Sequence, residues 1–204
     1  MTKKVMVLMG GFSAEREVSL QSGAGIAEAL RRKGYEVTTH DLSDTRQLLA
    51  ELGRSKPDVV FNALHGNWGE DGTVPALLDL LQIPYTHSGM QASCVGMNKY
   101  LCRLIAEKAG LKTAYGRKLT AREFITQGSP VARPFVVKPV SDGSSVGVFI
   151  VNNPEDVFKI RYNDPETEIL VEKYIPGQEL TVMCYHGKAH VVTELKANGG
   201  VFFF

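Results

Sequence analysis

The sequence predicts an α/β chain in which a parallel α/β unit comes first and an α+β part follows. In the first part, apolar segments alternate with segments of helical period, which is typical of right-handed βαβ units. In the second part, short segments rich in β-forming residues are joined by turns that contain glycine, which favours antiparallel pairing.

The first part is expected to begin with a strand at residues 5–9. Ser13 is expected to cap the following helix, which ends before Gly34. The face of this helix that packs on the sheet is predicted to be Val18, Ser22, Ile26, Ala29 and Leu30. The other elements expected here are strands at 35–40, 58–64 and 84–86 and helices at 45–52 and 75–81.

The second part is expected to begin with a helix that ends before Gly110. A hairpin then carries the loop VSDGSSVG between its strands. The elements expected in this part are helices at 100–109 and 155–161 and strands at 134–139, 148–151, 168–175, 180–185 and 189–195.

Length and composition limit the class of protein. The chain has 204 residues, of which 44% are hydrophobic and 22% are charged, and its formal net charge is +1. We therefore expect a buried core, and we expect no nucleic-acid or membrane partner that binds through bulk charge. The three cysteines are too few for a disulfide scaffold, and no apolar run reaches the ~18 residues of a transmembrane helix. These features predict a cytoplasmic protein.

The loops after the first and third strands form the first candidate site. Ligands of open parallel sheets bind at the carboxyl ends of the strands. Glu15 follows the first strand and is able to pair with a ligand ammonium group, while His65 follows the third. A role for Glu15 at the helix dipole and for His65 in loop packing explains the same residues. A dinucleotide site is disfavoured because G-x-G-x-x-G is absent and only Asp41 could bind a ribose.

The second candidate site is Lys138 with the Gly/Ser loop at residues 141–147. The backbone N–H and hydroxyl groups of such a loop donate to polyphosphate, and the lysine adds a positive charge. The loop is not of the Walker A type, because no Gly-Lys-Ser/Thr is present. An ordinary polar hairpin turn explains these residues equally well.

The third candidate site is the strand at residues 168–175 together with Glu179. An extended segment with free backbone groups is able to bond an adenine edge, and a nearby carboxylate accepts hydrogen bonds from ribose hydroxyls. An edge strand with solvated charges is the simpler interpretation. The histidines and cysteines do not have the spacing of zinc ligands, so no zinc site is expected.

Five segments in fixed order carry a family resemblance: GGFSAEREVSLQSG, ALHGNWGEDGTVPALLDLLQIPYTHSG, MNKYLCR, VVKPVSDGSSVG and LVEKYIPGQELTV. Together they resemble the D-alanine–D-alanine ligase family of the ATP-grasp superfamily, over nearly the whole chain. The resemblance implies a Rossmann-like N-terminal domain at residues 1–88 and an α+β ATP-grasp domain after it. Its central subdomain would cover residues 89–171, and its C-terminal subdomain would begin at residues 172–204.

The resemblance also implies a role for each candidate residue. Glu15 would hold the ammonium group of the first D-alanine, and His65 would approach its carboxylate. Lys99 and Lys138 would bind the phosphates of ATP. Ser144 would act beside Glu15 in catalysis, contacting both substrate and nucleotide. The other residues expected to bind the nucleotide are Ser145, Val146, Glu172, Lys173, Tyr174, Ile175 and Glu179.

The implied reaction joins two D-alanines at the expense of ATP. The γ-phosphoryl group would pass to the first carboxylate, and the amine of the second D-alanine would displace phosphate to give D-alanyl-D-alanine for peptidoglycan synthesis. Family members extend about a hundred residues further, so we expect Mg²⁺ ligands beyond residue 204 and a chain that is catalytically incomplete. A D-lactate or D-serine variant and a nucleotide-binding fragment without turnover stay open as alternatives. The resemblance further implies a homodimer.

Overall fold

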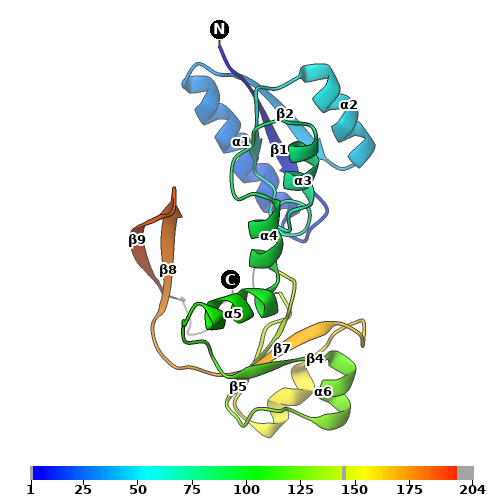
Figure 1. Cartoon of the computed structure of the whole chain (residues 1–204). Helices are drawn as coiled ribbons and strands as arrows, with labels where there is room; N and C mark the ends of the chain where they lie inside the picture. The colour runs from blue at the N-terminus through cyan, green and yellow to red at the C-terminus, as the bar shows by residue number, and fades with distance from the viewer. Residues whose placement is uncertain (1, 144–145, 197–204) are drawn as a thin grey trace. The chain divides into compact units, whose positions relative to one another are not determined.

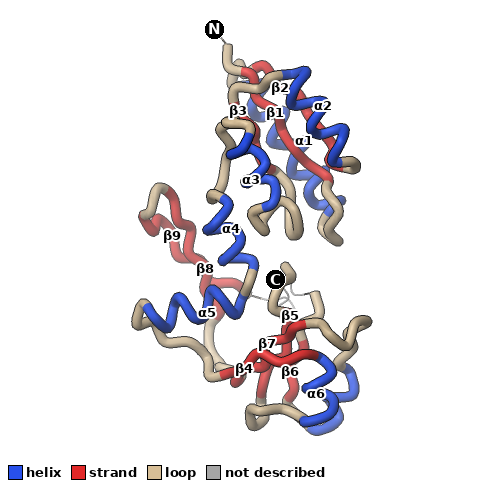
Figure 2. Tube along the Cα trace, turned by 45° about the vertical axis from the view of Figure 1, so that its right-hand side comes forward, coloured by secondary structure: helices blue, strands red, loops and turns tan. Residues whose placement is uncertain are grey.

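The structure is a computed structural model that describes residues 2–143 and 146–196. The chain divides into two units, Met1–Ile105 and Ala106–Phe204, each with a sheet and a core of its own. Figure 1 labels most of the elements, and Figure 2, which also labels β3 and β6, distinguishes helices from strands.

A three-stranded parallel sheet of order β2-β1-β3 lies at the centre of the first unit. In this sheet Val7 pairs with Thr39 on one side and with Phe61 on the other. The central strand is buried because both of its faces are covered by helices. The strands are β1 (Lys4–Gly10), β2 (Glu36–Leu42) and β3 (Val59–Asn62). The parallel arrangement predicted for the first half is confirmed.

Helices cover both faces of this sheet. α1 packs on the face that carries Val7, whereas α2 and α3 pack on the face that carries Met6 and Leu8. Leu48 of α2 is 1% exposed, and burial of such a side chain stabilises the fold by roughly 1.5–3 kcal/mol. The helices are α1 (Arg16–Arg32), α2 (Thr45–Ser55) and α3 (Thr73–Leu80).

Helix α1 differs from the prediction in its start. Ser13 does not cap it: the N-cap residue is Glu15, whose side chain makes no cap hydrogen bond. The Ser13 hydroxyl instead accepts from the Glu15 N–H at 3.2 Å, in a turn before the helix.

The face of α1 that packs on the sheet also differs from the prediction. Its fully buried residues are Ser19, Gly23 and Ala27, none of which was predicted, and the predicted Val18 is 56% exposed. The predicted Ile26 and Leu30 do pack against the core on this side of the sheet. Small side chains occupy this face because the helix lies close to the sheet. A Cβ on Gly23 would lie only 2.6 Å from Met9 Cβ.

The rest of the first unit agrees with the predictions only in part. The expected strand at residues 84–86 is a single parallel bridge between Val60 and Tyr85. The expected helix at residues 100–109 is present as α5 (Lys99–Lys108). The helix before it, α4 (Met90–Met97), was not predicted, and none of its residues is buried.

The second unit contains a four-stranded sheet of order β4-β7-β5-β6 with antiparallel pairing throughout. Val171 of β7 pairs with Arg117 on one side and with Val137 on the other. The predicted hairpin is present as the β5–β6 pair, but β4 was not predicted. The strands are β4 (Gly116–Thr120), β5 (Phe135–Pro139), β6 (Phe149–Val151) and β7 (Glu168–Lys173).

One face of this sheet is covered by the helix α6 (Ala121–Gln127) and the 3₁₀ helix η1 (Pro154–Lys159). Because side chains alternate along a strand, Phe135 and Val137 face these helices while Lys138 faces the other way. The core on this side is Phe124, Val131, Phe135, Val137, Val151, Ile160, Ile169 and Val171.

The predicted α-helix at residues 155–161 is the 3₁₀ helix η1. The side chain of Asn153 and that of Asp156 form a capping box around its first turn. Pro154 starts the helix, and a 3₁₀ helix of this length is a common connector between strands. α6 was not predicted.

The last two strands, β8 (Glu179–Tyr185) and β9 (Lys188–Leu195), form the predicted antiparallel hairpin. His186 and Gly187 make the turn with φ of 48° and 70°, which suits a two-residue type I′ hairpin. All residues of β8 are exposed. Over the described residues, none of the helices is long and apolar enough to span a membrane.

Candidate functional site

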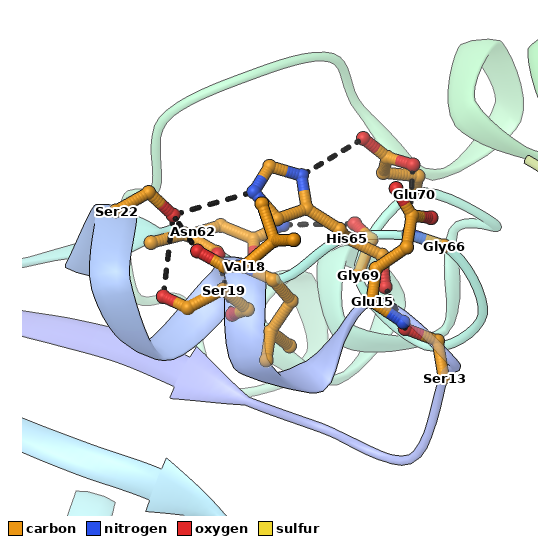
Figure 3. Close-up of polar contacts among 12 residues, drawn as sticks. Ser13, Glu15, Val18, Ser19, Ser22, Asn62, His65, Gly66, Gly69 and Glu70 are labelled. Atoms are coloured by element: carbon orange, nitrogen blue, oxygen red, sulfur yellow. Dashed lines mark hydrogen bonds and ion pairs between the residues drawn. The ribbon is translucent and has the colours of Figure 1, made fainter. Parts of the chain in front are cut away.

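The two loops of the first candidate site lie side by side at the carboxyl ends of β1 and β3 (Figure 3). The Ser13 hydroxyl donates to the carbonyl of His65 at 2.8 Å. A Cβ on Gly66 would lie 3.2 Å from Glu15 Oε2. The structure therefore brings the Glu15 carboxylate next to the His65-Gly66 backbone.

Ser19, which is fully buried in α1, joins the ends of the two strands. Its hydroxyl accepts from the Gly10 N–H at 2.9 Å and donates to the carbonyl of Ala63 at 2.7 Å. Sequence reasoning missed this residue. The signal was a serine followed at helical spacing by Gly23 and Ala27, a stripe of small residues that allows close packing on a strand.

His65 is held between two polar partners. Its Nε2 lies 3.3 Å from Ser22 Oγ, and its Nδ1 lies 3.8 Å from Glu70 Oε1. Glu70 also accepts from the Gly66 N–H at 2.8 Å, so the same carboxylate orients the ring and the loop backbone. The His65 side chain is 32% exposed, so a ligand is able to reach it.

The loop between β3 and α3 is ordered by its own side chains. Asn62 is 4% exposed; its Nδ2 donates to the carbonyl of Gly69 at 2.8 Å. Asp71 accepts from the Trp68 N–H at 2.8 Å and from the Thr73 N–H at 2.9 Å, where α3 begins. These bonds satisfy backbone donors and hold the loop in one conformation. Sequence reasoning did not single out Asn62 or Asp71.

Asp41, the residue that could bind the ribose in a dinucleotide site, forms an ion pair with Arg16. The guanidinium donates to both carboxylate oxygens, at 2.8 and 2.6 Å, and this contact raises the pKa of Arg16. A Cβ on Gly10 would lie 2.1 Å from Asp41 Oδ1, so the pair occupies the space beside the first loop. This arrangement gives no support to a dinucleotide site.

In the second unit, Lys138 and Glu172 form an ion pair of 2.6 Å on the sheet face opposite α6 and η1. Their side chains are 27% and 12% exposed. On the same face Lys118 of β4 contacts Glu168 of β7. This face therefore carries two lysine–glutamate pairs, with the buried Leu170 between the two glutamates of β7, and its charged groups are able to contact a charged ligand.

The end of β7 is anchored by backbone hydrogen bonds. The Lys173 N–H donates to Tyr115 O at 2.7 Å, and the Tyr174 N–H donates to Pro134 O at 3.1 Å. Among the described residues, the next donor, the Ile175 N–H, has no acceptor. The exposed Glu179 begins β8 a few residues later. A backbone donor and a carboxylate thus follow β7, as the third candidate site requires.

The remaining predicted residues lie in different places. Lys99 is the first residue of α5, in the first unit. Val146 is 53% exposed, and its N–H donates to Gly143 O at 3.2 Å. Ser144 and Ser145 lie outside the described residues. Within residues 2–143 and 146–196, no group of three His, Cys, Asp or Glu side chains is arranged to hold a metal ion.

A parallel α/β unit, followed by an antiparallel sheet with helices on one face and paired charges on the other, places the chain in the ATP-grasp class. The family model described as "D-ala D-ala ligase N-terminus" matches residues 4–56 and 44–88. The model described as "D-ala D-ala ligase C-terminus" matches residues 110–204. The chain belongs to the D-alanine–D-alanine ligase family.

Individual relatives agree with this assignment. The chain is 46% identical over 203 residues to the D-alanine–D-alanine ligase of Paramagnetospirillum magneticum, with 99% of this chain and 66% of the relative covered. It is 47% identical over 201 residues to that of Parvibaculum lavamentivorans, with 96% and 64% covered. The chain thus spans slightly less than two thirds of these curated relatives.

Among solved structures, the D-alanine–D-alanine ligase of Bacillus anthracis complexed with ATP is similar to the chain, with a TM-score of 0.81 and 29% identity. The likeness covers 97% of this chain and 67% of that structure.

Proposed function

We propose that the chain carries the amino-acid site and part of the nucleotide site of an ATP-dependent ligase that joins two D-alanines. The names of the relatives and the ATP complex of a similar structure support this function. The observation that carries the proposal for this chain is the position of Glu15. The Ser13 and Ser19 hydrogen bonds hold its loop against the loop of His65.

In the first unit, the Glu15 carboxylate would bind the ammonium group of the first D-alanine. A contact of this kind at 4 Å is worth roughly 4 kcal/mol at an effective dielectric of 20, before desolvation is subtracted. His65, oriented by Glu70 and Ser22, would face the carboxylate of the same D-alanine. Opposite charges at two ends of a small amino acid would fix its orientation.

In the second unit, Lys138 would exchange part of its contact with Glu172 for the phosphates of ATP. Lys99 and the loop residues Ser144, Ser145 and Val146 would supply further donors. The Ile175 N–H would bond the adenine edge beside Lys173 and Tyr174, and Glu179 would accept from the ribose hydroxyls. An exposed donor and a nearby carboxylate support this placement.

The proposed reaction begins when the first D-alanine carboxylate attacks the γ-phosphorus of ATP, and the bond to the β-phosphate oxygen breaks to release ADP. The amine of the second D-alanine then attacks the acyl phosphate, loses a proton and expels phosphate. Positioning and charge neutralisation dominate such transfers, and lysines serve both. Mg²⁺ ligands would lie outside the described residues, which contain no group of three His, Cys, Asp or Glu side chains arranged to hold a metal ion.

Release of phosphate from ATP tests the proposed reaction in protein made from the complete coding sequence. We expect release that depends on D-alanine. Release that is equal with L-alanine would contradict the proposal. D-lactate and D-serine as second substrates distinguish the related ligases, and light scattering of the purified protein checks the proposed homodimer.

Calorimetry with ATP tests the nucleotide part of the proposal. Lys138→Ala is expected to weaken ATP binding about tenfold or more, because a charge-assisted contact to phosphate is lost. Lys159→Ala is the matched control, since Lys159 lies on η1 and pairs with Asp156. Equal affinities for the Lys138 variant and the unmodified chain would remove the phosphate assignment.

A further inference from the structure

A cavity of about 480 Å³ lies in the second unit between α6, η1 and β5. Its floor is the pair Phe124 and Phe135, which are 3% and 1% exposed and pack edge to face with ring centroids 6.2 Å apart. Ile160 extends this floor. Sites for small molecules typically enclose about 300–1,000 Å³ with mostly apolar walls. The cavity therefore has the size and lining of a ligand site.

Large apolar side chains border this cavity and are exposed to solvent. Ile125 of α6 is 77% exposed, and Phe158 of η1 is 73% exposed. They come from the two helices that flank the cavity. Apolar surface that continues from a buried floor to an open rim favours an apolar ligand, which would remove it from water.

The guanidinium groups of Arg133 and Arg161 supply positive charge to the lining of the cavity. Among the described residues, no Asp or Glu lines it. Arg161 donates to its neighbour's carbonyl, Ile160 O, at 2.8 Å. Neither arginine forms an ion pair with a described residue. By contrast, the nearby Arg122 has a carboxylate partner in Glu166 at 2.7 Å. The cavity thus combines apolar walls with two arginine side chains that form no ion pair with a described residue.

This cavity is separate from the proposed nucleotide face. Phe135 points to the side of the sheet covered by α6 and η1, whereas Lys138 points to the other side. None of the second-unit residues that the structure describes and that are proposed to bind ATP lines the cavity. The lining residue Tyr162 does reach the end of the Gly/Ser loop, where its hydroxyl donates to Gly147 O at 2.7 Å.

We propose that the cavity binds a small amphipathic monocarboxylate. Its apolar body would lie on Phe124 and Phe135 between Ile125 and Phe158. Its carboxylate would accept hydrogen bonds from Arg133 and Arg161, since guanidinium groups match carboxylate geometry. A cationic ligand is disfavoured by the two arginines, and a fully polar ligand would leave the aromatic floor without a contact.

Titration of the chain with octanoate, followed by NMR of labelled isoleucine methyl groups, tests this site. The Ile125 and Ile160 signals are expected to shift saturably, and the Ile175 signal is expected to stay. The uncharged 1-octanol, matched in length, is expected to bind about tenfold more weakly, because it makes no charge-assisted contact. This comparison uses the unmodified chain, so it does not depend on the folding of a variant.

Variants test the role of the arginines. The double variant Arg133→Gln/Arg161→Gln is expected to weaken octanoate binding about tenfold. Arg122 belongs to α6, which flanks the cavity, but it pairs with Glu166. Arg122→Gln is therefore expected to leave octanoate binding unchanged. Absence of saturable shifts, equal binding of octanol, or an equal effect of Arg122→Gln would overturn the proposal. Octanoate binding is expected to stay intact in the presence of saturating ATP and in the Lys138→Ala variant. Failure of the nucleotide assignment is thus distinguishable from failure of the carboxylate site proposed here.

Discussion

Gly66 determines how closely the two loops of the amino-acid site approach each other. Its φ is +67°, and a Cβ there would lie 3.0 Å from Ser13 Cβ and 3.2 Å from Glu15 Oε2. A residue without a side chain satisfies both the backbone conformation and the space. The position of the Glu15 carboxylate thus depends on a glycine in the other loop.

Gly66→Ala is therefore expected to lower the free energy of unfolding by about 1–3 kcal/mol, because it adds strain and a close contact. It is also expected to weaken D-alanine binding. Gly25→Ala is the control: nothing lies within 4 Å of the added Cβ, and alanine in a helix interior stabilises by roughly 0.5–1 kcal/mol. Urea denaturation measures both variants. Equal stability changes of the same sign would show that Gly66 has no special role.

Glu15→Gln is expected to impair D-alanine binding far more than ATP binding, because the charge that would pair with the substrate ammonium is lost. Glu17→Gln is the matched control, because Glu17 lies in the first turn of α1. It is expected to change the affinities for D-alanine and ATP little. Calorimetry with each ligand gives the comparison. A comparable loss of both affinities in Glu15→Gln would count against the proposed role.

The sequence locates Glu15 and His65 because both follow buried strands, and the carboxyl ends of parallel strands meet at one edge of a sheet. It does not locate the residues that position them. Ser19 bonds to Ala63 and Ser22 approaches His65, each across more than forty residues of chain. Such contacts depend on the rotation of α1 over the sheet. The apolar periodicity predicts Ile26 and Leu30 on the packed face correctly, but it misses the small residues Ser19, Gly23 and Ala27, which lie deepest.

At the level of the elements, Ser19 connects α1 to the ends of β1 and β3. Ser19→Ala is expected to lower the free energy of unfolding by about 1–3 kcal/mol, because the buried Gly10 N–H loses its acceptor. Ser55→Ala is the control, since Ser55 only bonds the Glu51 carbonyl at the end of α2. Chemical denaturation compares the two. A cost for Ser19→Ala no larger than that of the control would contradict the structural role.

The elements that the sequence predicts correctly are those with strong apolar patterns, such as β1, β5 and β7. The elements that it misses have weak patterns for physical reasons. α4 has no buried residue, and β4 is an edge strand in which Arg117 and Lys118 are exposed. η1 was expected as an α-helix because propensity does not separate one short helix type from another. A 3₁₀ helix of this length is a common connector between strands.

Asp156 makes the stability of the second unit depend on pH in the acid range. Hydrogen bonds from Lys159 above all, and from the Asn152 and Asn153 N–H groups, lower the pKa of its carboxyl from 3.8 to about 2. A carboxyl with a depressed pKa stabilises the fold above its unfolded value, and the contribution is lost as the pH falls from about 4 to about 2.

Asp156→Asn is accordingly expected to flatten the decrease in unfolding free energy between pH 4 and pH 2, because the amide does not titrate. Lys159→Met is expected to act in the same direction, since it removes the largest cause of the shift. Thermal unfolding followed at several pH values measures the slopes. Slopes equal to that of the unmodified chain in both variants would exclude this contribution.

Over the whole molecule, burial is distributed unevenly among the sheets. The central strands β1 and β7 contain runs of residues that are at most 4% exposed, whereas every residue of β8 is exposed. Leu180, Met183 and Val192 of the β8–β9 hairpin are 56%, 61% and 62% exposed. An isolated two-stranded hairpin is only marginally stable in water, because it buries little apolar surface. Local unfolding free energies should therefore differ strongly along the chain.

Hydrogen exchange followed by mass spectrometry measures this difference. Peptides from β8 and β9 are expected to exchange almost as fast as an unfolded chain, while peptides from β1 and β7 are expected to exchange only through larger openings of their units. Val182→Lys, on the exposed hairpin, should consequently leave the exchange of β1 and β7 unchanged, because no buried contact is lost. Val137→Lys, at a fully buried position of β5, should accelerate exchange throughout the second sheet. Protection of β8–β9 as strong as that of β7 would mean that the apolar side chains of the hairpin are covered in solution, and the marginal stability inferred from their exposure would then be wrong.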